Sequence, residues 1–159
     1  FDPVTFNAQY ENIGETRASG LELAGTALAG GGLRFGGGYT FLDSKVIRSI
    51  SSSPIFAPGR NLYRRPRHSG SLQASYSRDR VSLALGGVFV GSRVDTDFNF
   101  PTISSNKGYA IWNASGEARL ARRTAAFVTL DNIANADYME PLGYPALGRT
   151  VRVGIRTRF

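Results

Sequence analysis

Apolar and polar side chains alternate with a period of two along most of this sequence, in segments of about ten residues. In residues 68–77, Leu72, Ala74 and Tyr76 share one side of the chain, while Gln73 and four serines share the other. A helix would scatter these serines around its axis, whereas successive side chains of a strand point to opposite faces. The alternation therefore predicts amphipathic β-strands.

The same pattern predicts an all-β protein with about eight antiparallel, up-and-down strands. We expect them at residues 4–13, 17–29, 33–43, 68–77, 81–93, 108–120, 124–134 and 150–159. Hydrophobic residues make up 42% of the chain, but no run approaches the roughly 18 apolar residues of a membrane-spanning helix. Transmembrane β-strands alternate instead, so the pattern indicates a transmembrane β-barrel segment.

The connections differ systematically in length. Residues 30–32, 78–80 and 121–123 form short turns, and the other connections are the long segments 44–62, 94–107 and 135–148 and a shorter one at 14–17. Short turns at one end and long loops at the other are typical of outer-membrane barrels. A soluble β-sandwich has no such asymmetry.

The alternation assigns the two faces of the wall. A charge on the lipid side costs about 2–4 kcal/mol at mid-membrane, so the polar side should face a wet or filled interior. The interior set includes Arg34, Gln73, Ser75, Glu117 and Arg152. The residues predicted to face lipid are Leu72, Ala74, Tyr76, Leu83, Leu85, Phe89, Trp112, Val151, Val153 and Ile155.

Charge and composition exclude several function classes. The net charge is +7, but the arginines are spread over strand ends, turns and alternate strand positions, which argues against nucleic-acid binding. Cysteine is absent, so disulfides and thiolate chemistry are excluded. His68 is the only histidine and lacks a catalytic partner, so we expect it to face solvent or form hydrogen bonds, and we expect no enzyme.

A resident metal or cofactor is not expected either. Asp95 and Asp97 flank one threonine, but two carboxylates supply too few oxygens for calcium. We expect both to lie in a solvated loop. Glycines at 36–38 and 86–87 lie inside strands, where they permit bends or close packing.

Six short motifs, in order along the chain, resemble those of TonB-dependent receptors. They are Thr16–Glu22 (TRASGLE), Tyr39–Asp43 (YTFLD), Arg64–Ser69 (RRPRHS), Leu130–Ile133 (LDNI) followed by Tyr138, Gly143–Arg149 (GYPALGR), and the terminal Phe159. The resemblance implies a bacterial outer-membrane barrel of about 22 strands, plugged by an N-terminal domain. Residues 1–159 would be its C-terminal strands, with the plug domain and TonB box absent.

The resemblance also implies a function and partners. The function would be import of a scarce metal chelate or cofactor, such as a ferric siderophore or cobalamin, and the wording of two motifs is similar to the cobalamin-receptor branch. Expected partners are outer-membrane lipid and lipopolysaccharide, the missing plug and barrel strands, and TonB through the absent N-terminal part. Phe159 would signal to the barrel-assembly machinery.

The candidate contacts for a ligand or for lipopolysaccharide are Arg64, Arg65, Arg67, Tyr144 and Arg149. Guanidinium groups pair with phosphate in a bidentate manner, but the first three are equally expected to pair with barrel carboxylates. Tyr144 and Arg149 also fit a structural role beside Asn132, capping a loop. The three long loops should supply any ligand contacts.

Two alternatives remain open from the sequence. One is a small, complete eight-stranded outer-membrane barrel with a structural or binding role, since eight strands can close. The other is a soluble lipocalin-like binder, which would pack its apolar faces inward and expose its serines.

Overall fold

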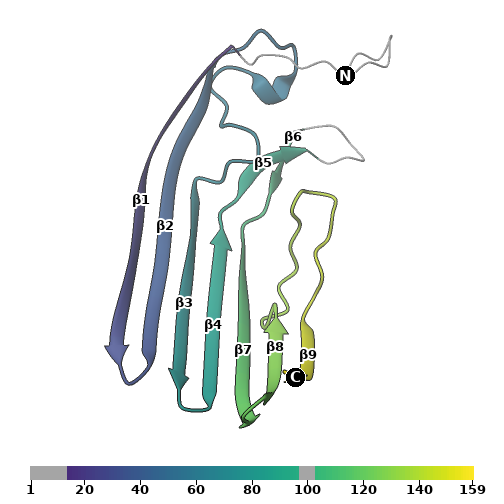
Figure 1. Cartoon of the computed structure of the whole chain (residues 1–159). Helices are drawn as coiled ribbons and strands as arrows, with labels where there is room; N and C mark the ends of the chain where they lie inside the picture. The colour runs from purple at the N-terminus through teal and green to yellow at the C-terminus, as the bar shows by residue number, and fades with distance from the viewer. Residues whose placement is uncertain (1–13, 97–102) are drawn as a thin grey trace.

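The structure is a computed structural model that describes residues 14–96 and 103–159 (Figure 1). Within this range nine strands and one short helical turn are formed, and the strand predicted at 4–13 lies outside it. The elements are β1 (Glu15–Gly30), β2 (Leu33–Arg48), η1 (Pro54–Phe56), β3 (His68–Arg78), β4 (Val81–Val90), β5 (Arg93–Thr96), β6 (Ile103–Asn106), β7 (Tyr109–Ala121), β8 (Thr124–Asp131) and β9 (Thr150–Thr157).

Seven of the described strands form one antiparallel sheet, which we call the wall. Its order is β1-β2-β3-β4-β7-β8-β9, so the wall strands are arranged in chain order, and β5 and β6 are inserted between β4 and β7. Strands β5 and β6 form a separate hairpin. Figure 1 shows the short turns at one end of the wall, the turn end, and the β5–β6 hairpin with the long connections at the other, the loop end. No helix in the described part of the chain has the length and apolarity to cross a bilayer.

The strand register places apolar side chains in rows along one face of the wall. Leu83, Gly116, Val128 and Val153 are successive cross-strand partners in β4, β7, β8 and β9. Directly opposed residues of an antiparallel pair share a face, and alternate residues along each strand share it too. The ten residues predicted to face lipid all lie on this face, at Leu72, Ala74, Tyr76, Leu83, Leu85, Phe89, Trp112, Val151, Val153 and Ile155.

The other face carries the polar residues. Ser82, Glu117, Phe127 and Gly154 form the neighbouring row, and Arg152 lies beside Thr129 on the same face. Arg152 donates to Asp131 Oδ2 at 2.9 Å and Arg156 donates to Glu117 Oε2 at 3.0 Å. These two ion pairs therefore join β9 to β8 and to β7 on the polar face.

No second layer formed by the described residues covers either face of the wall. Among the described residues, the only buried hydrophobic side chain is Val46. On the apolar face Leu72 is 56%, Leu83 51%, Val153 75% and Ile155 70% exposed. A soluble domain must bury its apolar face against another element, so the inward-packed arrangement of a lipocalin-like binder is not what this chain forms.

Aromatic rings cover two glycines of the apolar face. A Cβ atom at Gly87 would lie 2.5 Å from Trp112 Cζ3, and one at Gly70 would lie 2.4 Å from Phe89 Cζ. Both distances are far below van der Waals contact, so only glycine lets these rings lie on the backbone of the adjacent strand. The prediction that glycines inside strands permit close packing is confirmed at Gly87.

Three of the predicted loops are wrong in part. Strand β2 continues through Arg48 and β1 begins at Glu15, so residues 15–17 and 44–48 are strand. There residues 59–62 pair beside β2 in the plane of the sheet: Val46 N–H donates to Arg60 O, and its carbonyl accepts from Gly59 N–H. Residues 94–107 are not a plain loop either, since they contain most of the β5–β6 hairpin, whose four-residue strands are too short for a period-two pattern to reveal.

Candidate functional site

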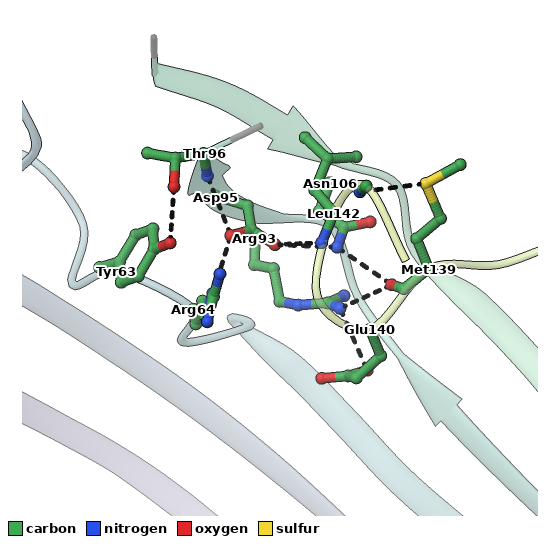
Figure 2. Close-up of polar contacts among 10 residues, drawn as sticks. Tyr63, Arg64, Arg93, Asp95, Thr96, Asn106, Met139, Glu140 and Leu142 are labelled. Atoms are coloured by element: carbon green, nitrogen blue, oxygen red, sulfur yellow. Dashed lines mark hydrogen bonds and ion pairs between the residues drawn. The ribbon is translucent and has the colours of Figure 1, made fainter. Parts of the chain in front are cut away.

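A network of polar side chains at the loop end joins three segments distant in sequence (Figure 2). Its centre is Asp95 of β5, which is completely buried. Asp95 Oδ1 accepts from Arg64 Nε at 2.8 Å and from Thr96 N–H at 2.9 Å. Asp95 Oδ2 accepts from Asn106 Nδ2 and from Leu142 N–H, both at 3.0 Å. One carboxylate thus holds the connection before β3, the hairpin and the β8–β9 connection together.

Arg64 reaches the network through its backbone as well as its side chain. Its N–H donates to Val94 O at 2.9 Å. Its φ of 55° lies in the left-handed region, which is unfavourable for a residue with a Cβ. Residues hold such a conformation when the surrounding contacts impose it, and here the ion pair with Asp95 supplies that contact.

Arg93 forms the second charged centre of the network. Its Nη2 donates to Met139 O at 3.2 Å and pairs with Glu140 Oε2 at 3.0 Å. Met139 O also accepts from Asn106 Nδ2 at 3.1 Å, and Tyr109 donates its hydroxyl to Glu140. The Arg93 side chain is only 2% exposed, and its Nη1 has no hydrogen-bond partner within residues 14–96 and 103–159.

The hydrogen bonds around Asp95 decide its charge state. Burial acts to raise the pKa of this carboxyl, but the donors Arg64, Leu142 N–H, Asn106 and Thr96 N–H outweigh it and hold the pKa well below its ordinary value. The same contact with Asp95 raises the pKa of Arg64. Both groups are therefore charged at neutral pH, as an ion pair whose carboxylate is buried and has its lone pairs satisfied.

A pocket of about 290 Å³ lies beside this network. Asn106, Met139 and Leu142 of the network line it, together with Lys107, Tyr138 and neighbouring residues. Its size is at the lower end of the roughly 300–1,000 Å³ of small-molecule sites. Its lining carries charges of both signs, because Lys107 and Asp137 both belong to it. Across the described ranges, no three His, Cys, Asp or Glu side chains are grouped as a metal site would require.

Asn132 organises the start of the β8–β9 connection. It is 3% exposed and has φ 50°. Its side chain accepts from Ala136 N–H at 2.8 Å and donates to Ala136 O at 2.9 Å, while its own N–H donates to Asn113 Oδ1 at 2.8 Å. The LDNI motif therefore closes the base of this loop.

The five predicted contact residues have different environments in the structure. Arg64 forms an ion pair with Asp95 at 2.8 Å, and Arg67 forms one with Asp43 at 3.4 Å. Arg65 and Arg149 are exposed, and Arg149 N–H donates to Asn135 Oδ1 at 2.9 Å. Tyr144 is 55% exposed. His68 accepts or donates a 2.7 Å hydrogen bond with Tyr39.

The prediction of a solvated loop is wrong for Asp95, because the hairpin and the 139–142 segment bury it; Asp97 lies outside the described residues. Sequence reasoning also missed Arg93, Asn106 and Glu140. The available signal was the RVDT segment, in which an arginine and an aspartate alternate and so share one side of a strand. That spacing predicts one charged side of a strand, but it does not identify the partners, because Arg93 pairs with Glu140 and Asp95 with Arg64.

A family model described as TonB dependent receptor-like, beta-barrel, matches residues 1–133. The vitamin B12 transporter BtuB of Vibrio cholerae is 28% identical over 103 residues, which are 64% of this chain and 17% of BtuB. The chain therefore spans less than a fifth of the length of this relative.

Solved structures show the same fold. The siderophore receptor PiuA of Acinetobacter baumannii superposes with a TM-score of 0.76 at 17% identity, over 92% of this chain and 22% of PiuA. The ferric-catecholate import receptor Fiu of E. coli K12 gives 0.72 at 22% identity, over 91% of this chain and 21% of Fiu. With its antiparallel wall, its one exposed apolar face and this family match, the chain belongs to the β-barrel domain family of the TonB-dependent receptors of the Gram-negative outer membrane.

Proposed function

We propose that this chain is the C-terminal part of the barrel of a longer receptor that imports a scarce metal chelate or cofactor, such as a ferric siderophore or cobalamin. The observation that carries this proposal is the open wall. Its terminal strands β1 and β9 pair with no further strand among the described residues, and the chain covers 22% of PiuA and 17% of BtuB. Both facts fit a section of a large barrel better than a complete eight-stranded one, because an unpaired sheet edge is an aggregation hazard.

In this proposal the two faces of the wall have different tasks. The apolar face contacts acyl chains, and the polar face lines the interior. The plug domain and the remaining strands, supplied by the rest of the receptor, fill and close that interior, and TonB acts through the N-terminal part. The role is transport, without a catalytic step in this segment.

The loop end would supply ligand contacts. The Asp95 network fixes the hairpin and the 139–142 segment in one arrangement, which lowers the entropy lost on binding. Arg65, Arg149 and Tyr144 are exposed near this region of the chain and are the proposed contacts for an anionic ligand or for lipopolysaccharide phosphates. Arg64 and Arg67 act structurally, through Asp95 and Asp43.

The other proposed partner is the barrel-assembly machinery. Strand β9 ends at Thr157, and Phe159 beyond it is fully exposed. An exposed aromatic at the end of an edge strand offers both a strand partner and an apolar anchor to an assembly factor.

Uptake measurements test the transport proposal. Deleting the gene should abolish TonB-dependent accumulation of one class among labelled ferric siderophores and cobalamin, and the intact gene should restore it. A protonophore should stop the restored uptake. If the deletion strain accumulates every chelate at the parental rate, the importer proposal is wrong, whatever the fold.

A further inference from the structure

An arginine-rich pocket lies at the turn end of the wall, opposite the Asp95 network. It is about 180 Å³ in volume and spans β7, β8 and β9. Its lining residues, which we call the arginine pocket, are Glu117, Arg119, Ala121, Arg122, Arg123, Thr124, Ala125, Arg156 and Arg158. Five arginines thus surround a single carboxylate.

The register places the centre of this pocket on the polar face. Arg119, Ala125 and Arg156 are successive cross-strand partners, so their side chains share one row. That row follows Glu117, Phe127 and Gly154 two positions along each strand, on the same face. Ala125 has the smallest side chain of its row and leaves the space between the two guanidinium groups.

The positive charge of the arginine pocket is not neutralised by the wall. Arg156 pairs with Glu117 at 3.0 Å and stacks over Phe127. In the part of the chain that the structure describes, the side chains of Arg119, Arg122, Arg123 and Arg158 have no hydrogen bond or ion pair. Four guanidinium groups around one occupied carboxylate give a local charge that an external anion can neutralise, and the fork of each guanidinium matches a carboxylate.

The size and the position of the pocket select the kind of anion. At about 180 Å³ it is smaller than the roughly 300 Å³ at which small-molecule sites begin, so it suits one or two carboxyl groups. A lipid headgroup is a poor candidate for this anion, because the exposed aliphatic residues Val128, Val153 and Ile155 lie on the opposite face of the same strands. A molecule with acyl chains on that face would have to cross the sheet to reach Arg119 and Arg156.

We infer that the arginine pocket binds an acidic polypeptide segment that runs along the polar face at the turn end. Aspartate or glutamate side chains of this segment lie between Arg119 and Arg156, and Arg158 contributes from the end of β9. The inference rests on the proposed function only in taking the polar face as the side away from lipid.

Site-specific photo-crosslinking in the outer membrane tests this. A benzoylphenylalanine replaces Ala125 in the full receptor, and Ala126, its neighbour on the apolar face, is the matched control position. Irradiation followed by mass spectrometry should yield a peptide rich in Asp and Glu from position 125. The Arg119→Gln/Arg158→Gln variant should lower that yield about tenfold, while Arg119→Lys/Arg158→Lys keeps most of it, since charge-assisted contacts dominate.

The possible outcomes distinguish a failure of the acidic-partner inference from a failure of the proposed function. A position-125 product that is a neutral peptide, or none above the background of position 126, overturns the acidic-partner inference and leaves the wall assignment intact. Lipid products at position 125 overturn the face assignment itself. A yield that does not respond to Arg119→Gln/Arg158→Gln, in receptor present at normal abundance in the membrane, also overturns the inference.

Discussion

Replacing Asp95 by asparagine should loosen the loop end without unfolding the wall. The substitution keeps the shape of the side chain but removes its charge and turns one acceptor oxygen into an NH₂ group. Four donors converge on the two oxygens of Asp95, so the new NH₂ group must face at least one donor. Removing one partner of a buried ion pair costs about 3–5 kcal/mol. Arg64 is 37% exposed and can regain water, so the low end of that range, about 3 kcal/mol, applies.

Hydrogen exchange measures this loss locally. In the receptor held in outer-membrane vesicles, the Leu142 and Thr96 amides donate to Asp95 and should exchange about 100-fold faster in Asp95→Asn, because each 1.4 kcal/mol is a tenfold change in an opening equilibrium. Asp131→Asn is the matched control. Its carboxylate pairs with Arg152 in an exposed setting, where ion pairs contribute about 0–1 kcal/mol. The reasoning is refuted if the two variants change Leu142 exchange equally.

The pH dependence gives a second readout of the same carboxylate. Since the folded pKa of Asp95 lies below its ordinary value of 3.8, its stabilisation is fully present above 3.8 and is lost as the pH falls through the folded pKa. Protection of Leu142, corrected for intrinsic exchange, should stay constant from about pH 7 to about pH 5 and fall only below about pH 4. Asp95→Asn should remove this dependence.

Three further sets of substitutions probe the wall and the loops. Leu85→Arg on the apolar face should destabilise the barrel by about 2–4 kcal/mol in a lipid-vesicle unfolding titration, whereas Ala84→Arg on the polar face should change it by less than about 1 kcal/mol; equal effects would contradict the face assignment. Asn132→Ala should lower the unfolding midpoint more than Asn132→Gly, because both lose the hydrogen bonds but only alanine is strained at φ 50°. Arg65→Ala and Arg149→Ala should weaken ligand binding in a calorimetric titration with stability unchanged within about 0.5 kcal/mol, and unchanged affinity would remove them as contacts.

The sequence predicted the wall well because each wall strand meets two different environments. Lipid on one side and a polar interior on the other impose period-two alternation along the strand, so the pattern locates strands and faces together. Residues 68–77 and 150–159 carry the pattern, and β3 and β9 form there. The motifs Thr16–Glu22 and Tyr39–Asp43 lie within β1 and β2, whereas Arg64–Ser69 and Gly143–Arg149 lie mainly in the long connections at the loop end.

Prediction failed where the chain leaves the wall. Strand β2 runs on to Arg48, where residues 59–62 pair with its edge, and the four-residue strands β5 and β6 are too short to show alternation. For Arg64 and Arg67 the sequence predicted ligand contact and carboxylate pairing equally, and the structure shows the pairing, but the sequence could not identify Asp95 and Asp43 as the partners. Local patterns carry no information about a partner that arrives from a distant loop.

By itself, the sequence determined an all-β chain with one apolar and one polar face and short turns at a single end, since these properties follow from neighbouring residues. Only the tertiary structure decided that Asp95 is buried. Its donors Arg64 and Leu142 are 31 and 47 residues away, and a carboxylate in a polar hairpin looks solvated until those segments close over it. The same holds for the arginine pocket, where cross-strand register brings Arg119 and Arg156 into one row, and the carboxylate of Glu117 in the neighbouring row pairs with Arg156.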